Sequence, residues 1–116
     1  MLNQIVLVGR LTKDPEVKKL ESGKCVSEIT IAVPRSFKNE EGIYETDFIS
    51  CNLWNETAQH ASEYCRKGDI IGVKGRLQMD KYEDKEGNNK SVLKVQAEKV
   101  TYLSSVKDKN HDDQER

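Results

Sequence analysis

The only tryptophan of the chain lies in a stretch whose alternation places aromatic rings among polar residues. The stretch T-D-F-I-S-C-N-L-W-N-E-T covers residues 46–57. With the two-residue period of a β-strand, one face carries Ile49, Cys51 and Leu53, and the other carries Phe48, Ser50, Asn52 and Trp54. Because the first face is already apolar, the two rings would lie on the solvent side of the strand. A flat ring exposed in this way can stack on another flat ring.

A second predicted strand, residues 69–82, has a ring on its polar face as well. Lys74, Arg76 and Tyr82 all fall on that face, whereas the other face is mainly aliphatic. Cations therefore lie beside the ring.

A third ring, Phe37, has Arg35 and Lys38 as close neighbours in the segment before the tryptophan stretch. Single-stranded nucleic acid requires this combination, since bases stack on aromatic faces without regard to sequence and cations follow the phosphates. A structural alternative is that Phe48 and Trp54 cover a subunit interface or one end of a barrel, with the cations simply solvated. We favour nucleic-acid binding because strand-borne rings recur on the polar face.

Catalysis has little support in the sequence. His60 falls within a predicted helix and His111 near the C-terminus, and the acidic runs E-E-G and E-D-K-E lie in predicted turns. We find no nucleophile, zinc or phosphate-loop motif. We therefore expect no enzymatic activity, no cofactor and no metal. The enzyme alternative is a metal-dependent nuclease, which would cleave single-stranded DNA in a chelator-sensitive way.

Composition indicates one small, highly charged domain. The chain has 116 residues, 19 Lys+Arg against 20 Asp+Glu, and a mean hydropathy of −0.77. A small core with so much charge often gains stability by oligomerisation. The net charge of −1 does not favour a polyanionic partner, so only the distribution of charge over faces could do so.

The cysteines and the apolar segments indicate a cytoplasmic protein. Cys25, Cys51 and Cys65 are an odd number with no paired motif, and they read as reduced core thiols. The N-terminus has no basic region before its short apolar run, and nothing later reaches the length of a membrane span. We therefore expect no membrane association.

The order of predicted elements is that of a five-stranded OB-fold barrel. Strands are predicted at 2–11, 25–33, 43–54, 69–82 and 91–103, with a loop at 34–42 and one helix at 55–67. An all-β barrel with its helix between strands 3 and 4 matches this order. Alternatives are a split sheet with one covering helix and a small open barrel. The predicted domain covers residues 1–103, and residues 104–116 are expected to form a disordered polar tail.

The helix prediction depends on capping and periodicity. Asn55 is expected to cap the first turn, and a buried stripe is expected to contain Ala58, Ala61, Tyr64 and Cys65. Arg66-Lys67-Gly68 would end the helix.

Four segments resemble bacterial and phage single-stranded DNA-binding proteins, in order and with similar spacing, over about residues 1–103. They are V-L-V-G-R-L-T-K-D-P-E-V (6–17), S-E-I-T-I-A-V (27–33), R-S-F-K (35–38) and S-E-Y-C-R-K-G (62–68). The resemblance implies an OB fold, a homotetramer, and wrapping of single-stranded DNA in DNA replication, DNA recombination and DNA repair.

The resemblance also implies site residues. The four base-stacking positions of the family correspond to Phe37, Phe48, Trp54 and Tyr82, which include every ring chosen above from the residues. The family's basic positions add Lys67 and Lys81 and support Lys38. The expected phosphate contacts are thus Arg35, Lys38, Lys67, Lys74, Arg76 and Lys81.

The chain departs from the family pattern in three ways. Glu56, Gln78 and Asp80 stand where well-studied members carry basic residues, so we expect a shallow dependence of binding on salt. Ile49 replaces a histidine that often supports a subunit contact. The chain ends D-D-Q-E-R instead of in an acidic, phenylalanine-ended tip, so we expect weak or no tail-mediated recruitment of repair enzymes.

Two uses of this fold therefore remain open. One is sequence-nonspecific binding and protection of single-stranded DNA, in a housekeeping, DNA-uptake, phage or mobile-element form. The other is a protein-interaction module of the primosome type with weak nucleic-acid binding. Quenching of Trp54 fluorescence by oligo-dT would distinguish them.

Overall fold

The computed structural model describes residues 1–104, and the predicted tail lies outside them apart from Ser104. The elements in chain order are β1 (Ile5–Leu11), β2 (Lys18–Lys19), β3 (Cys25–Lys38), β4 (Tyr44–Trp54), α1 (Asn55–Tyr64), β5 (Ile70–Glu83) and β6 (Asn89–Ser104). The five long strands match the five predicted ones. The two-residue β2 was not predicted, since two residues carry no periodicity.

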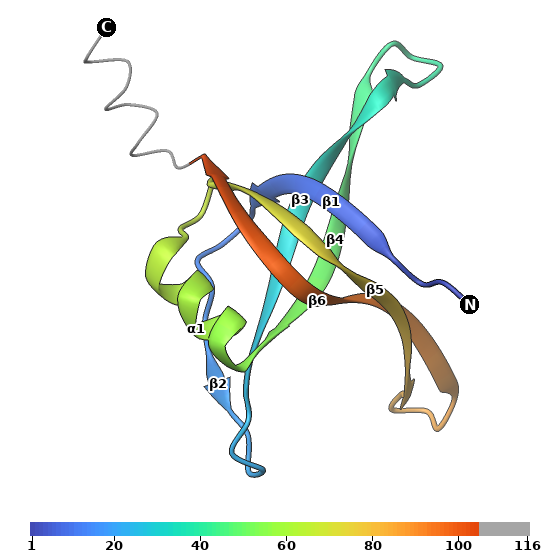
Figure 1. The fold of residues 1–116 in the computed structure, drawn as a ribbon. Coiled ribbons are helices and arrows are strands. Elements are labelled where there is room, and N and C mark those ends of the chain that lie inside the picture. The colour runs from blue at the N-terminus through green and yellow to red at the C-terminus, as the bar shows by residue number, and fades with distance from the viewer. Residues whose placement is uncertain (105–116) are drawn as a thin grey trace, which may run out of the picture.

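The strands form a closed barrel (Figure 1). Their order is β1-β5-β6-β4-β3-β2, and an additional pairing of β1 with β3 closes the sheet. All these pairings are antiparallel except β4 with β6, which run parallel. With α1 between the third and fourth long strands, the predicted OB-fold architecture is confirmed.

Gly9 allows the closure. A Cβ atom at this position would lie 2.6 Å from the carbonyl oxygen of Ala32, the residue that pairs with Arg10 across the β1–β3 contact. The interior glycine of the first strand therefore marks a barrel corner, as is common in strands.

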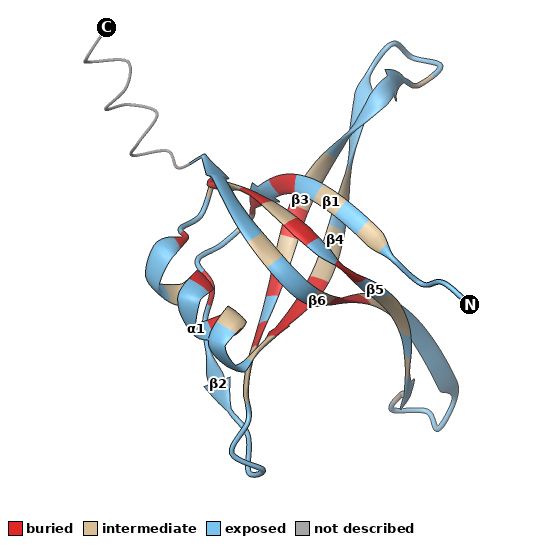
Figure 2. Cartoon of the chain, in the orientation of Figure 1, coloured by how far each residue is buried: buried red, intermediate tan, exposed pale blue. Residues whose placement is uncertain are grey.

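The core consists of the apolar faces that the alternation predicted. The largest fully buried aliphatic side chains are Ile29, Ile31, Leu53, Ile71, Val73 and Val95. From α1 and the turn after it, Ala58, Ala61 and Cys65 join the same cluster, so the helix covers one end of the barrel. Buried positions concentrate in the barrel wall and on the inner side of α1 (Figure 2).

Two hairpin arms project from the barrel, one formed by β3 and β4 and the other by β5 and β6 (Figure 1). The prediction of a loop at 34–42 was wrong for residues 34–38, because β3 continues to Lys38 and Pro34 pairs with Thr46, and the turn begins only at Asn39. Proline is accepted because the ladder is irregular here, with a register shift between Pro34 and Lys38. The residues of this arm are mostly exposed, in contrast to the barrel (Figure 2).

The helix differs from its prediction at both ends. Asn55 does not cap it; its backbone has a positive φ of 51°, and its side-chain oxygen accepts a hydrogen bond from the backbone N–H of Cys25 at 3.1 Å. The helix ends at Tyr64 instead of at Lys67. Tyr64 is also exposed, so it does not belong to the buried stripe with Ala58 and Ala61.

The cysteines are free, as expected, but not equally buried. Cys51 and Cys65 lie in the core, and burial raises the pKa of each thiol to about 11. Cys25 is only half-buried. Within residues 1–104, no helix is long and apolar enough to cross a membrane.

Candidate nucleic-acid interface

The outer face of β4 carries Phe48 at one end of the strand's barrel portion and Trp54 at the other. Phe48 is 68% exposed, whereas Trp54 is half-buried. Both lie on the face opposite the buried Cys51 and Leu53, so the predicted alternation is confirmed. Six residues of strand separate the two rings by about 20 Å. Ser50 and Asn52 lie between them on the same face.

Trp54 is held from the side by a residue of another strand. Its indole Nε1–H donates a hydrogen bond of 2.8 Å to the side-chain oxygen of Gln96 on β6. Gln96 is 8% exposed and lies opposite Asn52 in the parallel β4–β6 ladder. The bond holds the edge of the half-buried indole against β6. Trp54 is therefore a preoriented ring.

A row of polar residues runs across the strands beside Trp54. The registers place Glu28, Asn52, Gln96 and Arg76 in one line over β3, β4, β6 and β5. Arg76 donates to the side-chain oxygen of Gln78 at 3.2 Å, and Gln78 donates to Asp80 at 2.9 Å. The row thus brings the predicted cation Arg76 onto the same face as Trp54.

Lys94, on β6, forms an ion pair with Glu28 at 2.8 Å across this face. The hydrogen bond from its ammonium group to Glu28 is the main reason why the pKa of Lys94 lies above its ordinary value. The negative charge of Glu28 is therefore balanced by the ammonium group of Lys94.

The other two predicted stacking rings lie on the hairpin arms. Phe37 is 84% exposed near the end of β3, and Tyr82 is 54% exposed near the end of β5. Lys81 adjoins Tyr82, and Lys90 lies opposite it across the hairpin. The structure thus places one ring on each arm and two on the barrel wall, instead of gathering all four in one pocket.

The β3–β4 arm has an exposed ring that the sequence analysis missed. Tyr44 lies opposite Lys38, and the Lys38 ammonium nitrogen lies 5.6 Å from the centre of the Tyr44 ring. The signal was present, since Tyr44 shares the strand phase of Phe48 and Trp54. Because Tyr44 directly follows a predicted turn, its ring was not recognised as part of the face that carries Phe48 and Trp54.

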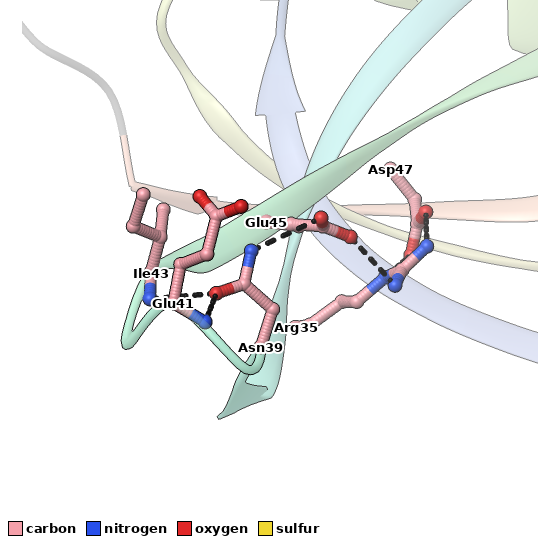
Figure 3. A network of polar contacts seen from close by, with 6 residues as sticks. All are labelled: Arg35, Asn39, Glu41, Ile43, Glu45 and Asp47. Atoms are coloured by element: carbon pink, nitrogen blue, oxygen red, sulfur yellow. Dashed lines mark hydrogen bonds and ion pairs between the residues drawn. The ribbon is translucent and has the colours of Figure 1, made fainter.

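Arg35, expected to contact phosphate, is engaged by two carboxylates of the facing strand (Figure 3). Its guanidinium donates two hydrogen bonds to Asp47, at 3.0 and 3.1 Å, and one of 2.8 Å to Glu45. Asn39 donates to the second oxygen of Glu45 at 3.2 Å. The hydrogen bonds with Arg35 hold the pKa of Asp47 below its ordinary value, and those with Asp47 raise the pKa of Arg35.

The two remaining predicted cations, Lys67 and Lys74, are not sequence neighbours of any predicted stacking ring. Lys67 is in the turn after α1, where its backbone N–H donates to Asp14 at 2.7 Å. Lys74 lies on β5 between Val6 of β1 and Lys99 of β6. Both side chains are exposed.

Comparison with known proteins identifies the family of the chain. The model of the single-strand binding protein family matches residues 2–103. Single-stranded DNA-binding proteins B and A of Bacillus subtilis are each 47% identical over 103 residues, and single-stranded DNA-binding protein 2 of Listeria innocua is 45% identical. The matches cover 89% of this chain, and 91%, 60% and 65% of those relatives respectively. The second and third relatives are thus considerably longer than the matched region. With its barrel, its outward rings and a family match over nearly its whole described length, the chain belongs to the single-strand binding protein family.

Proposed function

We propose that this chain binds and protects single-stranded DNA without sequence preference, by stacking bases on aromatic rings and contacting phosphates with lysines and arginines. The outward face of β4 carries the proposal: Phe48 is largely exposed although the opposite face of its strand is core. Replication, recombination, repair and DNA uptake are the processes in which such binding is used. The relatives are named as DNA-binding proteins, which supports a binding role instead of an enzymatic one.

Titration with oligo-dT tests this function through the intrinsic fluorescence of Trp54. We expect strong quenching, because a base stacked on the indole changes its environment. The Phe48→Ala variant should lose about 1–3 kcal/mol of binding free energy, the usual contribution of one stacked base. Tyr64→Ala is the matched control, since Tyr64 is an exposed ring of similar exposure on α1, 65% against 68%.

The alternative, a protein-interaction module with weak nucleic-acid binding, predicts the opposite result. Trp54 fluorescence would then not change on addition of oligo-dT, and Phe48→Ala would behave like Tyr64→Ala. Either outcome would reject single-stranded DNA binding through the outer face of β4.

We further propose that the protein assembles as a homotetramer. Val6 and Val8 on the outward face of β1 are 65% and 51% exposed, which supports burial against another subunit because adjacent exposed aliphatic side chains are unfavourable in water. Light scattering coupled to size exclusion should give four times the mass of the chain. Val6→Lys with Val8→Lys should lower that mass, and Glu21→Gln with Glu63→Gln is a control that raises the net charge by the same two units at exposed positions. A monomeric wild-type protein would contradict the assembly.

A further inference from the structure

A hollow of about 380 Å³ adjoins Trp54 on the side of β2. It is lined by Trp54, Val26 and Asn52, and by charged residues that include Lys13 and Lys18. A volume of this size falls within the range of small-molecule sites in proteins. Neither the alternation of strands nor the family resemblance pointed to the lysines of this hollow.

The registers show why a lysine of β2 reaches the tryptophan. Lys18 lies opposite Val26, and Val26 lies opposite Trp54. Directly opposed residues on neighbouring strands share a face, so these three residues form one row on the outer surface. Two strand spacings separate the ends of the row by about 10 Å. Lys18 therefore lies on the same surface as the indole, with the small Val26 side chain between them.

The charge balance of the hollow favours an anion. Within residues 1–104, neither Lys13 nor Lys18 forms an ion pair. Of the two lining carboxylates, Glu28 is already paired with Lys94, so Lys13 and Lys18 are opposed by Glu16 alone and the hollow keeps an excess of one positive charge. These lysines thus differ from Arg35, whose charge is satisfied by Asp47 and Glu45.

The segment that carries Lys13 is anchored to the barrel. The backbone carbonyl of Leu11 accepts a bond of 2.8 Å from the N–H of Gly68, and Asp14 accepts the N–H of Lys67. Pro15 is buried. Lys13 is therefore presented from a fixed backbone, so little conformational entropy would be lost when it binds a ligand.

We propose that this hollow is a further nucleotide subsite, which receives the nucleotide next to the base stacked on Trp54. Lys13 and Lys18 contact the phosphates on either side of that nucleotide, and Val26 and Asn52 form its floor. The subsite extends the path of the strand from β4 across β3 to β2. This assignment rests on the proposed binding of single-stranded DNA.

The test compares two neighbouring lysines of β2. Lys18 lies in the row with Trp54, whereas Lys19 has the alternate strand phase and is not among the residues that line the hollow. Affinity for oligo-dT is measured at several salt concentrations for the wild-type protein, Lys13→Gln with Lys18→Gln, Lys18→Gln alone and Lys19→Gln. For single strands the slope of log affinity against log salt changes by about 0.7 for each phosphate contact. We expect a slope shallower by about 1.4 for the double variant and about 0.7 for Lys18→Gln, and no change for Lys19→Gln.

The outcomes separate this subsite from the function on which it rests. If the wild-type protein binds oligo-dT but the double variant keeps the wild-type slope, the subsite is wrong and the function stands. If Lys18→Gln and Lys19→Gln lower the slope equally, the effect is one of overall charge and the subsite is also overturned. A wild-type protein that does not bind oligo-dT overturns the proposed function itself.

Discussion

Trp54 is half-buried with one edge anchored, and Gln96 supplies the anchor. A free indole on a surface would lose rotational freedom on stacking, whereas a ring already fixed by a hydrogen bond of 2.8 Å loses less. Since Gln96 is itself 8% exposed, its amide is held in place by the surrounding strands. Gln96 thus positions the ring that we propose to stack on a base.

Replacing Gln96 by leucine should weaken both the fold and the binding. The variant removes the acceptor and leaves the indole N–H unpaired in a half-buried site, which costs about 1–3 kcal/mol of unfolding free energy. Denaturant unfolding measures that loss, and Trp54 fluorescence anisotropy should show a more mobile ring. Oligo-dT should bind more weakly than to the wild type, but more tightly than to Trp54→Ala.

Gln4→Leu is the control for this experiment, because Gln4 is exposed before β1. In a Trp54→Phe background, which keeps a ring but has no N–H, Gln96→Leu should have little effect on binding. An equal loss of binding in both backgrounds would show that Gln96 acts through something other than the indole.

The two residues of this pair were not equally predictable. Trp54 could be placed on the outer face from its own strand, since alternation is local information. Gln96 could not, because its contact depends on the parallel register of β4 and β6, and these strands are about 40 residues apart in the sequence. Long-range registers are set by packing of the whole barrel.

At the scale of elements, the β3–β4 arm is where sequence and structure differ most. The sequence predicts that a strand ends before Pro34, and this prediction separates Arg35 from the strand that faces it. With the arm formed, Asp47 and Glu45 lie across from Arg35 and engage its guanidinium (Figure 3). For the same reason, the contact between the Tyr44 ring and the Lys38 ammonium group could not be predicted. A proline at an irregular ladder position gives no local sign that pairing continues beyond it.

We expect the two carboxylates to prevent Arg35 from contributing to phosphate binding. The Glu45→Gln and Asp47→Asn double variant removes them and should steepen the salt slope of oligo-dT binding by about 0.7, the value of one added contact. Adding Arg35→Gln to this variant should restore the original slope. Because the pKa of Asp47 is held below its ordinary 3.8, the carboxylate stays charged at neutral and mildly acidic pH, and the wild-type pairing should be unchanged between pH 5 and about pH 8.

The control lies at the tip of the same arm. Glu40→Gln with Glu41→Gln makes the same change in net charge, and in the described part of the chain neither side chain forms an ion pair. If this control steepens the slope as much as the other pair, the carboxylates act only through overall charge. In that case the pairing of Arg35 with Asp47 and Glu45 is not what limits phosphate binding.

For the whole molecule, the balance of charge limits how strongly electrostatics can hold a polyanion. The chain carries 19 basic and 20 acidic residues. On the outer surface of the described residues, two cations, Arg35 and Lys94, already have carboxylate partners. Affinity should therefore depend more on stacking and less on counterion release than in more basic relatives. The barrel itself was predictable from the order of its strands, whereas this pairing of surface charges required the registers.

The salt slope of the wild-type protein should accordingly be shallow for its family, and changing two acidic residues should steepen it. Glu56 lies in the first turn of α1, two residues after Trp54, and Asp80 accepts a hydrogen bond from Gln78 on the outer face of β5. Glu56→Lys with Asp80→Lys should steepen the slope by up to about 1.4, or two contacts. Lysine in the first helical turn lowers the free energy of unfolding by about 0.3–1 kcal/mol through the helix dipole, so unfolding is measured in parallel.

Glu21→Lys with Glu63→Lys supplies the comparison, since it makes the same change in net charge on exposed residues of the β2–β3 turn and of α1. The slope should change little in that variant, because neither residue lies on the outer faces of β4 and β5. Equal steepening in both variants would mean that net charge, and not its position, determines the salt dependence. The wild-type slope could instead already be as steep as that of more basic members of the family. The lysines without ion pairs would then make more phosphate contacts than expected. In that case stacking would be the smaller part of the affinity.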